Sequence, residues 1–499
     1  MTDSKKKSYR NIIKGTAIFG GVQIFQILLT ILKGKLVAVL LGPAGSGIAA
    51  LFISTTNIIT QFSGLGLSFS AVRDIAQANE VGDQQRMSRT IKVFRRWVWF
   101  TGLLGGVICL IFAKEFSKFA FDTTKYSWGF VWLSVSLLLN ALSTGDITLL
   151  QGTRQLQNMA KATVYGSGIG LILAFPCYYY WHLSGIVPAI IAASVASFIV
   201  NRYFARKIKL PHHKLTLKET FTTGQQMARL GIVLMISQVI GTVVTYVVNT
   251  FISQRGGIVD VGLFQSGTMI TNHSLGLVFT AMAVDYFPRL SAVADDTLKL
   301  RDLVNQQCIM VTLIITPLLI SLILFAPLLI RVLLSVEYVA ALPLVQWVSL
   351  GMLLKAASYA LGYVSFAKGD KRTFFWLEGI FGNALTLTFN TLGYSLLGIE
   401  GLGMSFFASY AIYMVVLIVV VYKKYNFRFY RDFFFIFILQ IVICLAVFSL
   451  VRWADNMFTL YTFGITLLAA ATYYSWRELD KLIDIKDLLN KKLKSSLVT

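Results

Sequence analysis

Lys355 is a cationic side chain near the middle of a long apolar stretch, at 341–367, that reads as a membrane helix. A lysine at the centre of a bilayer costs roughly 2.5–3.5 kcal/mol on insertion scales, so such residues mark binding sites or ion pathways. Asn140, the equivalent residue in an internal repeat given below, is also polar. We expect both to line a hydrated cavity. The alternative for Lys355 is a structural ion pair.

Two further lysines, Lys33 and Lys35, lie inside the first apolar stretch, at 12–41. Residues two apart point to different faces of a regular helix, unless Gly34 loosens the turn between them. Both are candidates for contacting an anionic substrate. The alternative is that they reach the outer membrane surface, because both lie far enough along the helix to do so.

Charged residues also gather at helix ends predicted to face the cytoplasm: Arg73, Asp74, Asp146, Asp285, Arg289 and Glu378. The arginines are candidates for receiving an anion from the inner leaflet. The acids, above all Asp146 and Glu378, are candidates for binding a coupling cation. Structural pairing of these charges is the alternative.

Motifs for catalysis or metal binding are not found. Cys109, Cys177, Cys308 and Cys444 each lie in a different apolar stretch, and the four histidines have no metal-ligand spacing. There is no Walker A motif, so ATP is not the expected energy source. The glycine-rich run 166–170 lies inside an apolar helix, where close helix packing explains it better than a dinucleotide loop. We expect no catalytic residue, no metal and no bound cofactor.

The composition places the chain in a membrane. It is 56% apolar and 14% charged, with a mean hydropathy of +0.69, whereas soluble domains carry about 25% charge. The net charge of +22 does not indicate nucleic-acid binding, because the basic residues gather in alternate loops. Most of the 45 Lys and Arg residues fall on one side, which predicts that both termini are cytoplasmic.

Apolar runs long enough to cross a bilayer recur along the whole chain. They predict fourteen helices, near 12–41, 47–75, 91–113, 128–151, 160–181, 187–206, 225–254, 262–288, 304–334, 341–367, 374–396, 400–423, 431–452 and 457–477.

The first twelve helices form a repeat. Five landmark pairs are 215–217 residues apart: Gly15 and Gly231, Gly47 and Gly262, Arg73 and Arg289, Trp132 and Trp347, and Gly152 and Gly369. Six helices return the chain to its starting side, so the two copies share one orientation and are expected to bracket a site near mid-membrane.

This repeat divides the chain into an N-lobe at 1–206, a cytoplasmic linker at 207–228 and a C-lobe at 229–425. Two additional helices follow at 426–477, and a tail at 478–499 has an amphipathic pattern typical of a membrane-surface helix. A solvated tail is the alternative. Within the linker region, 216–231 is a candidate interfacial helix.

Several stretches resemble Wzx polysaccharide flippases of the multidrug/oligosaccharidyl-lipid/polysaccharide superfamily. They are GKL at 34–36, LGPAGSG at 41–47, LQGTR at 150–154, VGLFQSGTMI at 261–270, FPRLS at 287–291 and LLKAASYALGYVSFAKGDKRTFF at 353–375. The resemblance covers about 11–425 and is strongest to flippases of the lipid-linked enterobacterial common antigen. Residues matching Lys35, Lys355 and Glu378 belong to that pattern, whereas Lys33 and Asp74 have no match there.

The resemblance implies an all-α, two-lobed, V-shaped bundle like that of the MATE transporters. It also implies an inner-membrane protein that flips an undecaprenyl-diphosphate-linked oligosaccharide outward by alternating access. Proton or sodium coupling, contact with membrane lipids and partnership with other polysaccharide assembly proteins are further expectations.

Three other functions remain open from the residues alone. An ion-coupled exporter of small molecules on the same fold would be expected to carry carboxylates, not lysines, at mid-membrane. A lipid II flippase belongs to the same transport class. A membrane glycosyltransferase or polymerase would need a large extramembrane loop, and no predicted outer loop is long.

Overall fold

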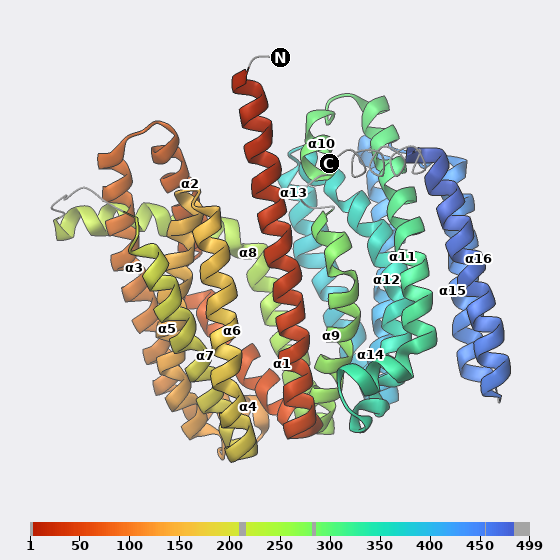
Figure 1. Cartoon of the computed structure of the whole chain (residues 1–499), viewed down its shortest axis with the longest axis horizontal. Coiled ribbons are helices and arrows are strands. Elements are labelled where there is room, and N and C mark those ends of the chain that lie inside the picture. Colours follow the sequence, from red (N-terminus) through yellow and green to blue (C-terminus); the bar gives the residue numbers. More distant parts are fainter. Residues whose placement is uncertain (1–2, 209–215, 282–285, 455, 484–499) are drawn as a thin grey trace, which may run out of the picture. The chain divides into compact units, whose positions relative to one another are not determined.

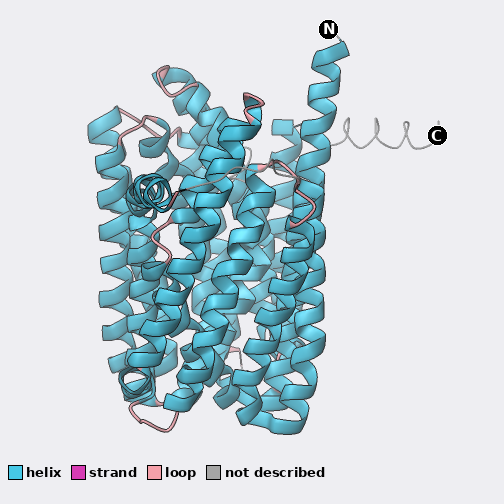
Figure 2. Cartoon of the chain, turned by 90° about the vertical axis from the view of Figure 1, so that its left-hand side faces the viewer, coloured by secondary structure: helices cyan, strands magenta, loops and turns pink. Residues whose placement is uncertain are grey.

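The computed structural model describes residues 3–208, 216–281, 286–454 and 456–483, which are almost entirely helical and contain no strand (Figures 1 and 2). The α-helices are α1 Asp3–Ser63, α2 Leu67–Glu80, α3 Gln84–Ile111, α4 Ala113–Phe121, α5 Ser127–Gly152, α6 Leu156–Trp181, α7 Ile186–Ala205, α8 Leu217–Gly256, α9 Ile258–Ala281, α10 Phe287–Ala292, α11 Thr297–Leu333, α12 Leu342–Ala367, α13 Lys371–Phe374, α14 Gly382–Tyr425, α15 Arg431–Trp453 and α16 Met457–Ile483. Short 3₁₀ segments lie at η1 His182–Gly185 and η3 Val336–Ala341, and η4 Phe375–Phe381 is a π-helix.

Nine helical stretches within the described residues are long and apolar enough to cross a membrane. Three of them, Gly21–Ser63, Leu156–Ala205 and Lys371–Tyr425, have 43, 50 and 55 residues. A single span needs about 20 residues, so each of these three holds two of the predicted spans. α8 and α9 correspond to the two remaining predicted helices and fall outside the nine. The predicted all-helical, multi-span membrane fold is confirmed.

The internal repeat is visible in the backbone as well as in the sequence. Three pairs of residues with positive φ are 215 or 216 residues apart: Gly42 and Gly257, Arg154 and Gly369, and His182 and Gly398. Gly42 and Gly398 interrupt what are otherwise continuous helices. The chain therefore bends at equivalent places in the two copies of the repeat.

The turn after Gly42 packs tightly against the start of α9. A Cβ atom added to Gly47 would overlap the carbonyl group of Ile258, and one added to Gly262 would overlap the carbonyl group of Pro43. These contacts are reciprocal: Gly47 and Gly262 are 215 residues apart, as are Pro43 and Ile258. The glycines of this motif are thus required by backbone-to-backbone packing.

The chain forms two compact units. The first comprises Met1–Gln265 with Leu333–Ser335, and the second comprises Ser266–Val332 with Val336–Thr499. α8 and the start of α9 thus group with the first unit, although the repeat assigns them to the C-lobe. The repeat boundaries at 207–228, the V shape and the role of the tail at 478–499, which lies largely outside the described residues, stay predictions.

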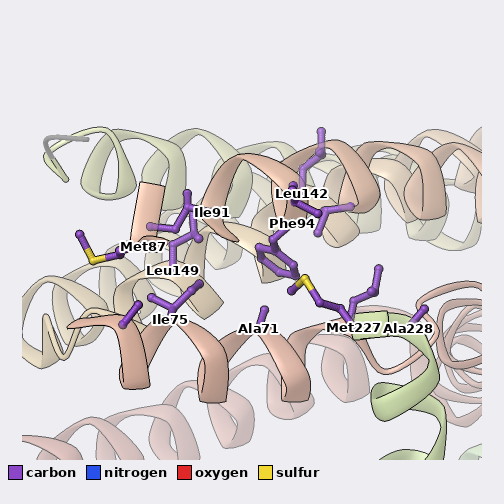
Figure 3. Packing of buried hydrophobic residues seen from close by; sticks show 13 residues of the cluster. Ala71, Ile75, Met87, Ile91, Phe94, Leu142, Leu149, Met227 and Ala228 are labelled. Carbon is purple, nitrogen blue, oxygen red and sulfur yellow. The ribbon is translucent and has the colours of Figure 1, made fainter. Parts of the chain in front are cut away.

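The first unit has an apolar core at the end predicted to be cytoplasmic (Figure 3). Leu67, Ala71, Ile75 and Ala78 form one face of α2 because residues three and four apart lie on the same side of a helix. This face packs against buried residues of α3, α5 and α8, among them Ile91, Phe94, Leu142, Leu149 and Met227.

α8 begins within the predicted interfacial segment and is anchored to α3. The Thr216 side chain and Glu219 form a capping box that satisfies the first backbone N–H groups of the helix. The indole of Trp97 donates a hydrogen bond to the Thr220 carbonyl at 2.9 Å, and Arg96 donates to the Thr220 hydroxyl at 2.6 Å. In Figure 1 the start of α8 runs across the direction of α3 and α5.

The last two helices pack together and belong to the second unit. Arg452 near the end of α15 forms an ion pair with Glu400 of α14 at 2.6 Å. The Phe448 ring of α15 lies 4.5 Å from the Trp347 ring of α12. α15 is therefore joined to the helices of the repeat by both charge and aromatic contacts.

Candidate functional site

Lys355 lies in an aromatic cage within the second unit. Its ammonium nitrogen is 5.5 Å from the ring centre of Phe279 of α9, 5.8 Å from Phe406 and 5.7 Å from Tyr410, both of α14. Ring faces attract cations at such distances, with energies that grow as water is removed. Among the described residues Lys355 has no ion pair and no hydrogen-bond partner, so the structural ion pair considered above is not formed there.

Glu378 lies two helical turns from this cage. A Cβ atom added to Gly362 would lie 2.6 Å from its Oε1, and Gly362 is seven residues after Lys355 on α12. A seven-residue spacing places Lys355 and Gly362 on one face, about 10 Å apart along the axis. The Tyr413 hydroxyl donates a hydrogen bond to Glu378 Oε1 at 2.5 Å.

The Glu378 carboxylate opens into a pocket of about 210 Å³. Most of the residues around it have an oxygen atom in the side chain: Glu378, Asn383, Thr386, Ser409, Tyr410 and Tyr413. The amide nitrogen of Asn383 donates to the backbone carbonyls of Glu378 and Gly379, which leaves its carbonyl oxygen as an acceptor. The buried Ser409 hydroxyl has no hydrogen-bond partner in the described part of the chain. Such a set of oxygens suits a proton or a small monovalent cation.

The π-helix η4 carries Glu378 and therefore sets its direction. π-Helical turns insert an extra residue into a helix and occur frequently at functional sites. Asp370 starts this region, because its carboxylate accepts a hydrogen bond from the Thr373 N–H at the beginning of α13. Asp370 also forms a 2.5 Å ion pair with Lys424 of α14. Together these contacts fasten the segment before Glu378 to α14.

Lys33 and Lys35 belong to the first unit and have different surroundings. Lys35 Nζ donates a 2.6 Å hydrogen bond to the carbonyl of Leu334, which belongs to the same unit. Lys33 lines a pocket between α1, α6 and α7. This placement favours burial of Lys33 over the interfacial position considered from the sequence.

Asp146 is buried in a predominantly basic cluster. Its Oδ1 accepts a 3.1 Å hydrogen bond from Arg202 of α7, and only 3% of the residue is exposed. Arg95 and Arg206 add positive charge nearby. Its Oδ2 has no hydrogen-bond partner among the described residues. This pairing favours the structural role of Asp146 over cation binding.

The remaining sequence candidates are mostly on the surface of their units. Arg73, Asn140 and Arg289 are exposed, and Asp74 is half-buried. Asp285 lies outside the described residues. Their proposed substrate and ion roles stay predictions, as does a cavity shared by Lys35 and Lys355, which lie in different units.

The aromatic partners of Lys355 were not predicted from the sequence. Phe406, Tyr410 and Tyr413 recur at helical spacing, which places them along one face of α14. This spacing could have shown from the sequence that the three rings lie together. Nothing local in the sequence indicates that Phe279 of α9 completes the cage, because that contact depends on tertiary packing.

The sequence of this chain is similar to those of known proteins. Residues 36–343 match the family described as "Polysaccharide biosynthesis protein". The Lipid III flippase of Escherichia coli strain K12 is 24% identical over 393 residues, which cover 77% of this chain and 91% of that protein. The resemblance to lipid-linked oligosaccharide flippases is thereby confirmed.

Two solved structures share the fold. The lipid II flippase MurJ in an inward closed conformation matches with a TM-score of 0.68 and 14% identity, covering 94% of this chain and 99% of that one. An inward-facing multidrug resistance MATE family transporter of the MOP superfamily matches with a TM-score of 0.66 and 14% identity, covering 86% and 96%. Since the family match spans more than half of the residues, this chain belongs to the polysaccharide biosynthesis protein family.

Proposed function

We propose that this protein flips an undecaprenyl-diphosphate-linked oligosaccharide from the cytoplasmic to the outer leaflet of the bacterial inner membrane. The observation that carries the proposal is the match to a Lipid III flippase over 91% of that protein's length, within a family matched at 36–343. The repeat of six helices supports alternating access, because repeated units can rock about a site near mid-membrane. We treat the chain as a transporter, with both termini in the cytoplasm.

Lys355 is the residue that we assign to the anionic part of the substrate. Within the described residues Lys355 forms no ion pair, so it retains its capacity to pair with a diphosphate, whereas a lysine held in an ion pair would first have to exchange partners. Lys35 is assigned the same role in the first unit, and its bond to the Leu334 carbonyl would have to be released for this. The polyprenyl tail would remain in lipid.

The Glu378 pocket is our candidate for ion coupling. Its carboxylate, amide and hydroxyl oxygens offer ligands for Na⁺, and the carboxylate can instead take up a proton. Tyr410 lines this pocket and also contacts Lys355, so binding at one site can affect binding at the other. An ion gradient would then bias the substrate site between its two accessible states.

Genetic complementation tests the substrate assignment. A bacterial strain lacking its Lipid III flippase is given the wild-type gene, Lys355→Ala, or Lys371→Ala, which removes an exposed lysine of the same unit. We expect restored surface glycan with the wild type and Lys371→Ala, and loss with Lys355→Ala at equal membrane abundance. Full restoration by Lys355→Ala would refute its role, and failure of the wild type would point to another lipid-linked glycan.

A small-molecule exporter remains the second candidate, favoured by the fold shared with the MATE transporter. It predicts resistance to cationic drugs in cells that express the chain. Lys355, which forms no ion pair with the described residues, argues against it, because a cationic substrate would be repelled there.

A further inference from the structure

The first unit contains a pocket that the proposed transport function does not use. It has a volume of about 300 Å³ and lies between α1, α6 and α7. We call it the Lys33 pocket. Its polar side chains come from all three helices: Gln26, Thr30, Lys33, Ser167 and Ser197.

Small residues on α6 and α7 create this space. A Cβ atom added to Gly166 would lie 3.3 Å from Cα of Ser197, and one added to Gly170 would lie 3.3 Å from Cα of Ala193. The two helices therefore approach backbone to backbone. Apart from Leu171, the residues that α6 and α7 contribute to the pocket are glycines, alanines and serines.

Lys33 brings a positive charge into this pocket, with no partner for it among the described residues. The residue as a whole is half-buried, but neighbouring protein atoms surround its ammonium group and shield it from solvent. None of the residues that line the pocket is acidic, and Lys33 has no hydrogen bond or ion pair within the described part of the chain. A desolvated charge without a counterion is costly, so a ligand of opposite charge would stabilise the arrangement.

The groups beside Lys33 define the chemistry of that ligand. The Ser167 and Ser197 hydroxyls and the Gln26 amide can donate hydrogen bonds, whereas the Thr30 hydroxyl already donates to the Gln26 backbone carbonyl at 2.8 Å. A cation surrounded by neutral donors suits a compact oxyanion, since each oxygen can accept several bonds.

We infer that the Lys33 pocket binds a phosphate-type oxyanion within the first unit. Free phosphate and the phosphate of an anionic lipid head group present the same oxygens, so either source satisfies this chemistry. The site is separate from the Lys355 cage and from the Glu378 pocket, which both lie in the second unit. It does not depend on the proposed transport substrate.

Amine labelling of the purified protein tests the inference directly. The wild type is placed in nanodiscs of neutral phosphatidylcholine and treated with a small amine-reactive ester, and each labelled lysine is quantified by peptide mass spectrometry. Sodium phosphate is compared with sodium chloride of equal ionic strength. We expect several-fold slower labelling of Lys33 in phosphate and unchanged labelling of Lys161, an exposed lysine of α6. Equal protection of both lysines would overturn the inference.

A second arm identifies the source of the oxyanion. Nanodiscs with phosphatidylglycerol and no free phosphate should protect Lys33 if a lipid head group enters the pocket. Protection only by free phosphate assigns the site to a soluble anion. Absence of protection in both conditions would refute the site.

Thermal unfolding provides a readout if the ester never reaches Lys33. We expect phosphate to raise the melting temperature of the wild type and of Lys161→Gln, but not of Lys33→Gln. An equal rise in Lys33→Gln, or no rise in any of the three, would contradict the inference. Neither amine labelling nor thermal unfolding measures transport. A negative result in these experiments therefore does not contradict the proposed flipping, and a failed complementation does not contradict the proposed oxyanion site.

Discussion

At the scale of residues, the second unit combines a caged lysine and a pocketed carboxylate on neighbouring helices. Glu378 approaches α12 at Gly362, two turns from Lys355, and Tyr410 lies beside both Lys355 and the Glu378 pocket. Opposite charges at that distance attract without forming an ion pair. A change in the charge at Glu378 would therefore alter the electric field at Lys355, and this is how we propose that the ion site influences the substrate site.

Glu378→Gln should uncouple transport from its ion gradient. The amide keeps a hydrogen-bond acceptor for the Tyr413 hydroxyl but carries no negative charge and cannot take up a proton. We expect flipping in proteoliposomes to become insensitive to an imposed proton or sodium gradient. Glu337→Gln, which changes an exposed acid of the same unit, is the matched control and should retain the dependence. A gradient response that survives in Glu378→Gln would remove Glu378 from the coupling site.

Asp370 gives a pH-dependent contribution to stability. The hydrogen-bonded Lys424 ammonium, with the Thr373 N–H and the Tyr425 hydroxyl, holds the pKa of this carboxyl well below its ordinary value. A lowered folded-state pKa stabilises the protein above the unfolded value, near 4, and the contribution is lost as pH falls toward the folded value.

Asp370→Ala should therefore lower stability by about 1–2 kcal/mol at neutral pH, through loss of the cap and the charged hydrogen bonds. The measurement is the thermal melting temperature in detergent from neutral pH down to about pH 3. We expect the gap between variant and wild type to narrow as the pH falls below about 4. A gap independent of pH would show that the charge of Asp370 contributes nothing.

At the scale of elements, helices were largely predictable and their interruptions were not. Long apolar runs mark spans because a bilayer fixes their length, and each of the fourteen predicted helices overlaps a helix among the described residues. The amphipathic helix α4 was not predicted, because with nine residues it is too short to cross a bilayer. The π-helix η4 was not distinguished from an α-helix, because the helix predicted at 374–396 rests on the length of an apolar run alone.

The repeat was predictable from the sequence for a physical reason. Gly42 and Gly257 must adopt positive φ, and Gly47 and Gly262 must admit a neighbouring backbone, so both copies retain glycine at the same register. By contrast, most of the residues that surround Lys33 and Lys355 come from helices far away in the sequence. Spacing along one helix cannot reveal them.

Gly47→Val tests the close approach between the two turns. A side chain there would collide with Ile258, so we expect a loss of about 1–3 kcal/mol, seen as a lower melting temperature. Gly168→Ala in α6 is the control, because a Cβ atom there has no neighbour within 4 Å. The control should be neutral or more stable by up to about 1 kcal/mol, as alanine favours helices. Equal melting temperatures for Gly47→Val and the wild type would disprove the tight contact.

At the scale of the whole molecule, the proposal requires a fixed orientation in the membrane. Positively charged residues gather on the side that includes both termini, which predicts that this side is cytoplasmic. The connection between α2 and α3 should then face the cytoplasm, and the connection between α4 and α5 should face outward.

Single cysteines report this orientation in intact cells. Thr124→Cys, between α4 and α5, should react with a membrane-impermeant thiol reagent, and Val81→Cys, between α2 and α3, should react only after the cells are opened. Val81 is 79% exposed, so burial cannot explain its protection. The half-buried Cys177 is replaced by serine to reduce background, while the other three cysteines are buried. The opposite labelling pattern would invert the assigned topology and with it the direction of transport.

The most direct test of the central claim is flipping by the purified protein. Proteoliposomes receive a fluorescent undecaprenyl-diphosphate-linked oligosaccharide, and a membrane-impermeant quencher follows its movement between leaflets. We predict ion-gradient-dependent flipping by the wild type and a tenfold to hundredfold slower rate in Lys355→Ala, since a charged contact contributes about 1.5–3 kcal/mol. Lys355→Arg should retain part of the activity, and Lys371→Ala should match the wild type. Flipping by Lys355→Ala at the wild-type rate would contradict the account.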